Sequence, residues 1–407
     1  MTRASLALIL LAGCYQGREI TELSPEMTAV VAGNNAFAVD VYSQIAAEDD
    51  GNLFLSPFSM SAALGMTMAG AETTTLEEMR AVLQVGLDDG LFHENFGALM
   101  RDLSGHHRGR PYQLAVANRL FGQQGMSWKA PFMGVCTDDY DAPLQEMDYV
   151  GDAEGARHDI NAWVADQTED KIEELLGAGS IDASTRMVLV NAIYFKADWA
   201  SQFEESNTAP LPFTLASGEE IDVPTMQQTV EASVYSDAAV SVLRLPYETD
   251  ELSMIIALPA EPDGVADLEA GLSAEQVDAW LDGMDEGGDV AVKLPRFEMR
   301  YELSLKETLS AMGMPSAFDP DTVDLSGMTD DAALVVDDVI HEAYVKVDEE
   351  GTEAAAATAV VTREMSASIP AEFFAQHPFV FFIRDDVTGS ILFMGRVADP
   401  SLPAAEG

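Results

Sequence analysis

The sequence holds few side chains whose type and spacing would support catalysis. It lacks the G-x-S-x-G elbow of hydrolases, the phosphate loop G-x-x-x-x-G-K-[ST], the dinucleotide motif G-x-G-x-x-G and the zinc motif H-E-x-x-H. His93-Glu94 and His341-Glu342 begin like the zinc motif, but the second histidine is missing from both. The sequence therefore points to no known catalytic constellation, and we expect a protein that is not an enzyme.

Metal ligands are equally sparse. The only cysteines are Cys14 and Cys136, which excludes a disulfide framework and a four-cysteine zinc site. The histidines are scattered; they are His93, His106, His107, His158, His341 and His377. Asp319, Asp321 and Asp324 do not have the spacing of a calcium loop and are typical of an acidic surface turn. We expect no metal and no cofactor.

The most unusual stretch runs from Glu349 to Pro370, with the sequence EEGTEAAAATAVVTREMSASIP. An alanine-rich helix is one interpretation. Gly351 and the β-branched run 360–362 count against a permanent helix. With a period of two, one set is small and uncharged (Thr352, Ala354, Ala356, Thr358, Val360 and Thr362), whereas the other carries Glu353 and Arg363. The segment can thus serve either as an exposed loop or as a strand with one buried face.

Helical periodicity dominates the first third of the chain, and strand patterns follow. Helices are predicted at 29–47, from Ser56-Pro57, at 71–84, 160–176 and 304–312. Strands are predicted at 187–195, 242–247, 252–258, 290–295, 296–303 and 335–347, and a hairpin joins 379–384 to 390–397. Because strands and helices do not alternate as βαβ units, the pattern favours an α+β domain.

Composition narrows the possible partners of the chain. Its 407 residues are 47% hydrophobic, as in folded proteins. Acidic residues number 70 and basic residues 21, which gives a formal net charge of −49. Nucleic acid is excluded as a natural partner, because phosphate binding needs a basic surface.

The first residues have the features of an export signal. Arg3 precedes the short apolar run 4–11, which is far shorter than the roughly 20 residues of a membrane-spanning helix. Leu11-Ala12-Gly13-Cys14 resembles the bacterial lipobox, in which the signal is cut before a lipidated cysteine. We expect a signal peptide at 1–13, lipidation of Cys14, a tether at 14–26, and an exported protein anchored at the cell envelope or surface, or else extracellular. An ordinary secretory signal or a wrongly assigned start is the alternative.

Four motifs give the sequence a resemblance to a known family. They are Asn52-Leu53-Phe54-Leu55-Ser56-Pro57-Phe58-Ser59, Asn191-Ala192-Ile193-Tyr194-Phe195-Lys196-Ala197-Asp198-Trp199, the segment 347–358, and Pro378-Phe379-Val380-Phe381-Phe382-Ile383 with Phe393-Met394-Gly395-Arg396-Val397. On these motifs the chain resembles the serpins, the serine protease inhibitors, from about residue 27 to 400, followed by a tail at 401–407. The resemblance implies one domain with three β-sheets, eight or nine helices and an exposed reactive-centre loop.

The resemblance also implies a mechanism. A serpin offers its loop as a substrate, and after the protease forms an acyl-enzyme the loop inserts into the central sheet and traps the covalent complex irreversibly. The expected partner is a serine protease, bound by a monomeric inhibitor. Small hinge residues suit insertion; here the hinge is Glu350, Gly351, Thr352, Glu353, Ala354, Ala355, Ala356, Ala357 and Thr358.

Individual residues follow from the same resemblance. Family spacing from Gly351 places the reactive bond between Met365 and Ser366, which implies an elastase-like or chymotrypsin-like target. Cleavage after Arg363 or Glu364 is the alternative; Arg363 would suit a trypsin-like enzyme, and a cysteine protease is a further alternative target. The residues matched to sheet opening are Trp199 at the top of the central sheet, and Ser56, Asn191 and His341 beneath its middle.

Purely structural interpretations of these residues stay open. Trp199 could be an ordinary core aromatic residue and His341 an ordinary buried histidine. The whole protein could also be a non-inhibitory serpin that acts as a binding protein or protease substrate, or a hydrolase with an unrecognised site.

Overall fold

The computed structural model describes residues 22–104, 112–248, 251–331, 334–336, 338–352 and 370–402. Cys14, the hinge residues 353–358 and the predicted reactive bond at Met365 and Ser366 lie outside the described residues. Among the described residues, no helix combines the length and apolarity needed to cross a membrane.

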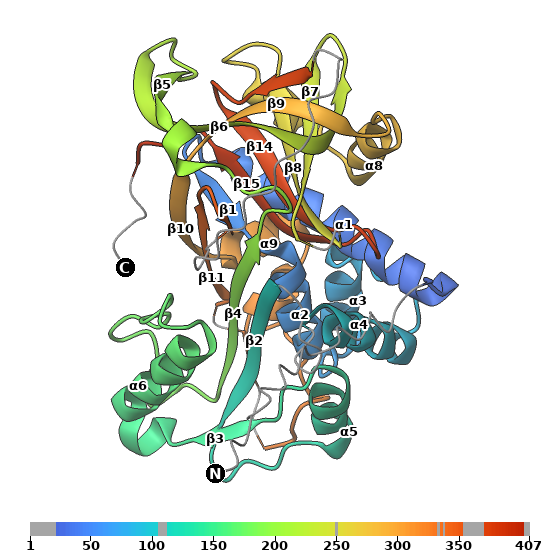
Figure 1. Cartoon of the computed structure of the whole chain (residues 1–407). Coiled ribbons are helices and arrows are strands. Elements are labelled where there is room, and N and C mark those ends of the chain that lie inside the picture. The colour runs from blue at the N-terminus through green and yellow to red at the C-terminus, as the bar shows by residue number, and fades with distance from the viewer. Residues whose placement is uncertain are drawn as a thin grey trace, which may run out of the picture.

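Nine α-helices occur in the described ranges. They are α1 Pro25–Ala46, α2 Pro57–Met68, α3 Thr73–Val82, α4 Asp89–Ser104, α5 Ala130–Gly134, α6 Tyr149–Gln167, α7 Val265–Ala270, α8 Ala274–Asp282 and α9 Lys306–Met312. Short single-turn helices lie at Val135–Asp139, Glu205–Asn207 and Pro315–Phe318. Figure 1 shows α1 to α5 gathered on one side of strands β2 and β4, and α6 on the other side.

The first helix starts earlier than the periodicity predicted. The Ser24 hydroxyl accepts a hydrogen bond from the Met27 N–H at 3.0 Å, and Pro25 occupies the first helical position. This combination of cap and proline is a strong helix start. The helix therefore begins at Pro25, inside the stretch 14–26 that was expected to be tether.

The central sheet has six strands in the order β10-β11-β12-β4-β2-β3. They are β10 Phe297–Ser304, β11 Ile340–Val347, β12 Gly351–Thr352, β4 Met187–Asp198, β2 Tyr112–Gln123 and β3 Gln145–Met147. One hydrophobic cluster packs α6 against the face that includes Phe121, Val190 and Ala192. The main core covers the other face through Leu114, Ile193 and Phe195. This explains the unbroken apolar run of β4, since a strand covered on both faces needs no polar side.

A second set of nine strands runs in the order β1-β15-β14-β8-β7-β6-β9-β13, with β5 also paired to β6. They are β1 Leu53–Leu55, β15 Ile391–Val397, β14 Phe379–Asp385, β8 Leu252–Pro259, β7 Val240–Pro246, β6 Glu220–Ser236, β9 Gly288–Pro295, β13 Ala371–Phe374 and β5 Ala209–Thr214. The long β6 pairs with β5 and β9 up to residue 232 and with β7 from Ser233. It thus joins two sheets, and with the six-stranded sheet the expected three-sheet α+β fold is confirmed.

The predicted extent of one helix was wrong. The helix predicted at 160–176 belongs to α6, which starts at Tyr149 and ends at Gln167. Glu169 and Asp170 adopt positive φ angles of 51° and 60°, and the Thr168 hydroxyl bonds back to the Val164 carbonyl at 2.9 Å. A left-handed pair terminates a helix. Ile172, Leu175 and Leu176 are buried all the same, in an irregular segment.

The strand predicted at 335–347 begins only at Ile340. Asp338 accepts hydrogen bonds from the N–H of Val339 and the hydroxyl of Ser304. Such local bonds compete with a strand ladder and keep the preceding residues irregular. The hairpins predicted at 242–258 and 379–397 are confirmed as β7–β8 and β14–β15.

Candidate functional site at the hinge and the seam

Two residues of the predicted hinge, Gly351 and Thr352, already lie inside the six-stranded sheet. Gly351 and Thr352 form β12, which pairs antiparallel with both neighbours. Thr352 is opposite Val347 of β11 and Ala197 of β4, and Gly351 is opposite Asp198. Below this point β4 and β11 pair with each other directly, Ala192 with Glu342 and Ile193 with Ala343. We call these two direct pairs the seam.

Thr352 is held by an aromatic pair at the end of β4. Its side chain is 1% exposed, and its hydroxyl lies 2.6 Å from the Tyr247 hydroxyl. The Tyr247 ring stacks on Trp199 with ring centroids 4.6 Å apart and an interplanar angle of 8°. Burial raises the pKa of Tyr247, although the bond to Thr352 opposes the rise. The Tyr247 phenol is therefore neutral, and Trp199 packs against the residue that contacts the hinge.

Backbone hydrogen bonds fix the turn that precedes β12. The Trp199 indole N–H donates to the Asp348 carbonyl at 2.9 Å, and its backbone N–H donates to the Glu350 carbonyl at 2.9 Å. The Phe203 N–H donates to the Glu349 carbonyl at 2.8 Å. The Glu349 carboxylate is itself buried, and the Arg296 Nε donates to it at 2.7 Å. A charge-assisted pair of this kind anchors the turn.

Gly351 is required by close backbone approach. A Cβ atom at this position would lie 2.1 Å from the Ala197 carbonyl oxygen and 2.7 Å from the Asp198 Cα. Both neighbours are backbone atoms of β4, so neither can move aside without breaking the strand. A side chain at 351 is therefore incompatible with the paired hinge.

Negative charges crowd the entrance of the hinge. Burial raises the pKa of the Glu350 carboxyl, and Asp348, Asp198 and Glu205 raise it further. Burial also raises the pKa of Asp198, against the effect of Lys196, and Asp348 adds to the rise. The like charges meet where β12 enters the sheet, and Lys346 offsets Asp348 through a 2.9 Å ion pair.

The polar cluster predicted beneath the sheet is partly assembled. Ser56 caps α2, and its backbone N–H donates to the His341 Nε2 at 3.1 Å, while its hydroxyl donates to the Leu392 carbonyl at 2.7 Å. Burial lowers the pKa of His341 to about 3, so the ring is neutral and its Nε2 is the acceptor. Asn191 lies on β4 beside the seam, opposite Asn118 of β2. The side chain of Asn191 is not among the parts of the chain that the structure describes.

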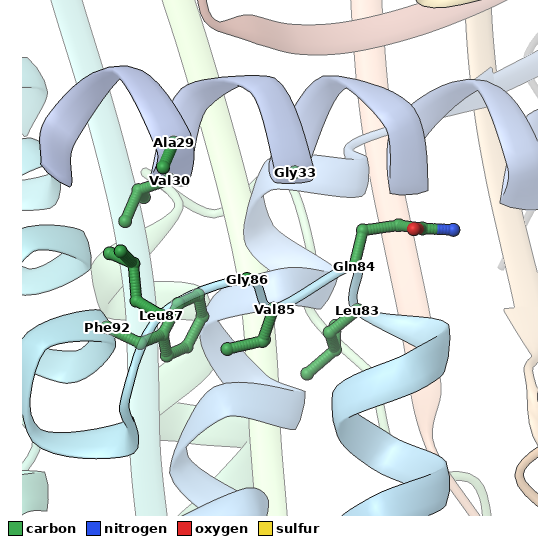
Figure 2. Close-up of a pocket in the computed structure, with 9 residues that line it drawn as sticks. All are labelled: Ala29, Val30, Gly33, Leu83, Gln84, Val85, Gly86, Leu87 and Phe92. Carbon is green, nitrogen blue, oxygen red and sulfur yellow. The ribbon is translucent and has the colours of Figure 1, made fainter. Parts of the chain in front are cut away.

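Besides the hinge and the seam, the described residues hold a small pocket and no cluster of metal ligands. No group of three or more His, Cys, Asp or Glu side chains among those residues could hold a metal ion. A small pocket between α1 and the connection from α3 to α4 is lined mainly by apolar groups such as Val30, Leu83 and Phe92 (Figure 2). Its polar member, Gln84, donates outward to Asp40. The side chains that line the pocket include no acid, base or nucleophile.

Sequence reasoning missed two partners of the hinge. Tyr247 and the ion pair between Arg296 and Glu349 join β12 to segments about 50 to 100 positions away along the chain. No local signal marks Tyr247, which follows an ordinary strand ending in Pro246. The roles of Trp199, Ser56, Asn191 and His341 in sheet opening stay predictions, although the structure places all four around the hinge and the seam.

The comparisons with known proteins agree with this geometry. The family model described as Serpin (serine protease inhibitor) matches residues 32–400. Serpin B6 from Macaca fascicularis is 38% identical over 380 residues, covering 92% of this chain and 100% of the relative. Leukocyte elastase inhibitor from Xenopus tropicalis is 39% identical over 371 residues, covering 89% and 97%. The crystal structure of uncleaved ovalbumin has a TM-score of 0.82 at 28% identity and covers 91% of this chain and all of its own. The chain belongs to the serpin family of serine protease inhibitors.

Proposed function

We propose that this serpin traps serine proteases by inserting its reactive loop between β4 and β11. The observation that carries the proposal is the position of Gly351 and Thr352, which already pair with both strands. Continuing the same register places Ala356 opposite Ile193 and Ala343, and Ala357 opposite Ala192 and Glu342. These are the four residues of the seam. The inserting strand would therefore replace the two direct pairs of the seam.

Physical reasons favour insertion at this place. Each new ladder hydrogen bond contributes about 0.5–1.5 kcal/mol net. The residues that would face inward are small, so they can be buried without a clash. The seam is a short parallel contact of two pairs, and its loss costs little compared with a full new strand between two partners. Under this proposal, the chain acts as a monomeric inhibitor and not as an enzyme.

The target class we propose is elastase-like or chymotrypsin-like. Support comes from Met365 at the expected reactive position and from the relatives named as leukocyte elastase inhibitors. The test is to incubate the protein with elastase, chymotrypsin and trypsin, boil the mixtures in detergent, and sequence the released C-terminal peptide. We expect covalent complexes with elastase or chymotrypsin and a peptide that begins at Ser366. If trypsin instead released a peptide that begins at Glu364, the residue before the reactive bond would be Arg363 and not Met365. Cleavage without any stable complex would leave a serpin fold with a non-inhibitory role.

We also propose that the mature chain is anchored by a lipid on Cys14 at the cell envelope. The support is the run from Arg3 to Leu11 followed by Leu-Ala-Gly-Cys. The test is metabolic labelling with a fatty acid in a bacterial host, with Cys14→Ser as the control. Label on the native chain that is absent from the variant supports the anchor. Unlabelled native chain released into the medium contradicts it.

A further inference from the structure

The seam is covered by the segment that follows α6. Figure 1 shows α6 beside the lower part of β4 and β2. The segment from Thr168 to Leu176 is tied to α6 at its far end, where the Leu176 carbonyl accepts from Arg157 at 2.8 Å and from Asn161 at 2.9 Å. Ile172, Leu175 and Leu176 belong to the hydrophobic cluster that includes Ala192 of the seam, and Ile340 at the start of β11 packs against this cluster. We call residues 168–176 the strap.

A buried carboxyl group lies at the seam on the strap side of the sheet. Glu342 is 3% exposed and alternates with His341, whose side chain points to the opposite face toward Ser56. The Arg300 Nε lies 3.4 Å from the Glu342 Oε1. The same guanidinium donates to the Lys171 carbonyl in the strap. Arg300 therefore links the seam carboxyl to the strap.

The strap has a second contact with β11. The Lys171 ammonium lies over the Tyr344 ring, 5.5 Å from its centroid. The Tyr344 hydroxyl donates to Glu298 of β10 at 2.8 Å. Tyr344 and Glu342 share one face of β11, because they are two residues apart. Two neighbouring side chains of β11 are thus engaged with the strap, one directly and one through Arg300.

Charged and titratable groups near Glu342 lie on β10, on the strap and on β11. On β10, Arg300 attracts its carboxylate and Glu302, directly opposite in the register, repels it. The strap contributes Lys171, β11 contributes Tyr344, and the opposing residue of β4 is the uncharged Ala192. Burial raises the pKa of Glu342 from 4.5 to about 7, Arg300 lowers it and Glu302 raises it. The carboxylate therefore loses more by leaving water than it gains from Arg300.

We propose that Glu342, Arg300 and the Lys171 carbonyl form a latch that holds the strap over the seam, and that ionisation of Glu342 favours its release. Insertion at the seam requires β4 and β11 to part beneath the strap. When they part, the Glu342 carboxyl reaches water, where the ionised form is stable. Glu342 and Arg300 are thus positioning residues, which control access of the loop to the sheet. This inference rests on the proposed insertion mechanism.

The sign of the pH effect follows from linkage. The pKa of Glu342 is raised in the closed sheet, so the closed sheet holds a proton that the opened sheet releases. Opening becomes easier as the pH rises from about 4.5 to about 7, and it changes little above that. With pKa values of about 7 closed and 4.5 opened, the opening equilibrium rises up to about tenfold between pH 6 and pH 8.

The test compares wild type with Glu342→Gln, which keeps the shape and the acceptor but cannot ionise. The rate of covalent complex formation with one protease is measured from pH 5 to pH 8.5, and the ratio of wild type to variant is plotted. The ratio removes the pH dependence of the protease itself. We expect the ratio to rise by roughly three- to tenfold between pH 6 and pH 8, with a plateau above. The matched control Glu146→Gln, an exposed carboxylate on β3 of the same sheet, should give a flat ratio.

A second measurement does not depend on the protease. Hydrogen exchange at the backbone amides of residues 191–194 and 341–344, which span the seam, reports its opening. At pH 7.5 these amides should exchange faster in wild type than in Glu342→Gln, by up to about 200-fold for pKa values of about 7 in the closed sheet and 4.5 in the opened sheet. If Glu342→Gln fails to fold, Glu302→Gln serves instead, because removing this charge lowers the pKa of Glu342 and should make the pH dependence shallower.

The outcomes separate the latch from the inhibitory mechanism. A flat ratio together with equal exchange rates overturns the latch, even when both proteins trap the protease. Absence of covalent complex at every pH overturns the insertion mechanism, whereas the exchange measurement still decides whether Glu342 controls the seam.

Discussion

The substitution Thr352→Arg places a charge at the point where the hinge is already buried. Thr352 is 1% exposed between β4 and β11, and its hydroxyl contacts the Tyr247 phenol, which is neutral. An arginine side chain there would have to be buried with one neutral oxygen as its partner, or it would force β12 out of the sheet. Leaving a buried charge unpaired costs on the order of 3–5 kcal/mol.

This penalty can be compared with the trapping step. Insertion competes with hydrolysis of the acyl-enzyme, and each 1.36 kcal/mol changes a rate tenfold. A penalty of about 3 kcal/mol would slow insertion about 150-fold. Hydrolysis by the protease is unaffected by the hinge, so nearly every encounter should end in cleavage. We expect Thr352→Arg to keep the fold but to act as a substrate.

The assay is the stoichiometry of inhibition, together with the yield of covalent complex on a denaturing gel. Thr352→Ser is the control, because it keeps the hydroxyl that contacts Tyr247 and should still form the complex. Circular dichroism of both variants checks that the fold is intact. A Thr352→Arg protein that forms as much complex as wild type would refute the assignment of β12 as the start of the inserting strand.

Three other outcomes follow from the same contacts. Gly351→Val should displace β12, because its Cβ would lie 2.1 Å from the Ala197 carbonyl oxygen, and the variant should be cleaved without trapping; a normal complex yield would contradict this. Arg296→Gln removes the cation beside the buried Glu349 and should lower the free energy of unfolding by about 1–2 kcal/mol, a value reduced because Arg296 is 41% exposed. Chemical denaturation measures this change. An unchanged midpoint would show that the ion pair does not contribute to stability. Protein cleaved in its loop should melt at a higher temperature than intact protein in calorimetry, since about a dozen new ladder bonds give an upper bound of order 10 kcal/mol before ordering entropy is subtracted; equal midpoints would mean that the loop does not insert.

The sequence alone determined the class of fold, and it predicted which segment inserts. Unbroken apolar runs such as 187–195 indicated strands covered on both faces, and the order of helices and strands indicated an α+β domain. These are local properties, because periodicity and side-chain shape act over a few residues. The small residues after Gly351 were informative for the same reason, since a strand that must enter a packed sheet can carry no bulk on its inner face.

The ends of several elements depended on contacts that the sequence does not show. Ile172, Leu175 and Leu176 continue the apolar spacing of α6, yet they belong to the strap, because a left-handed pair at residues 169–170 ends the helix first. Burial alone therefore did not distinguish a helix from a packed irregular segment. Periodicity reports which residues are buried, and backbone geometry decides how the chain carries them there.

Only the tertiary structure decided the partners of the hinge and of the seam. Tyr247 reaches Thr352 across 105 positions of sequence, and Arg300 joins Glu342 to a strap 129 positions earlier in the chain. The near-neutral pKa of Glu342 has the same origin, since it follows from burial between strands and the charges of β10. A residue's type gives its ordinary pKa, whereas the dielectric and the charges around it are set by segments that the fold brings together.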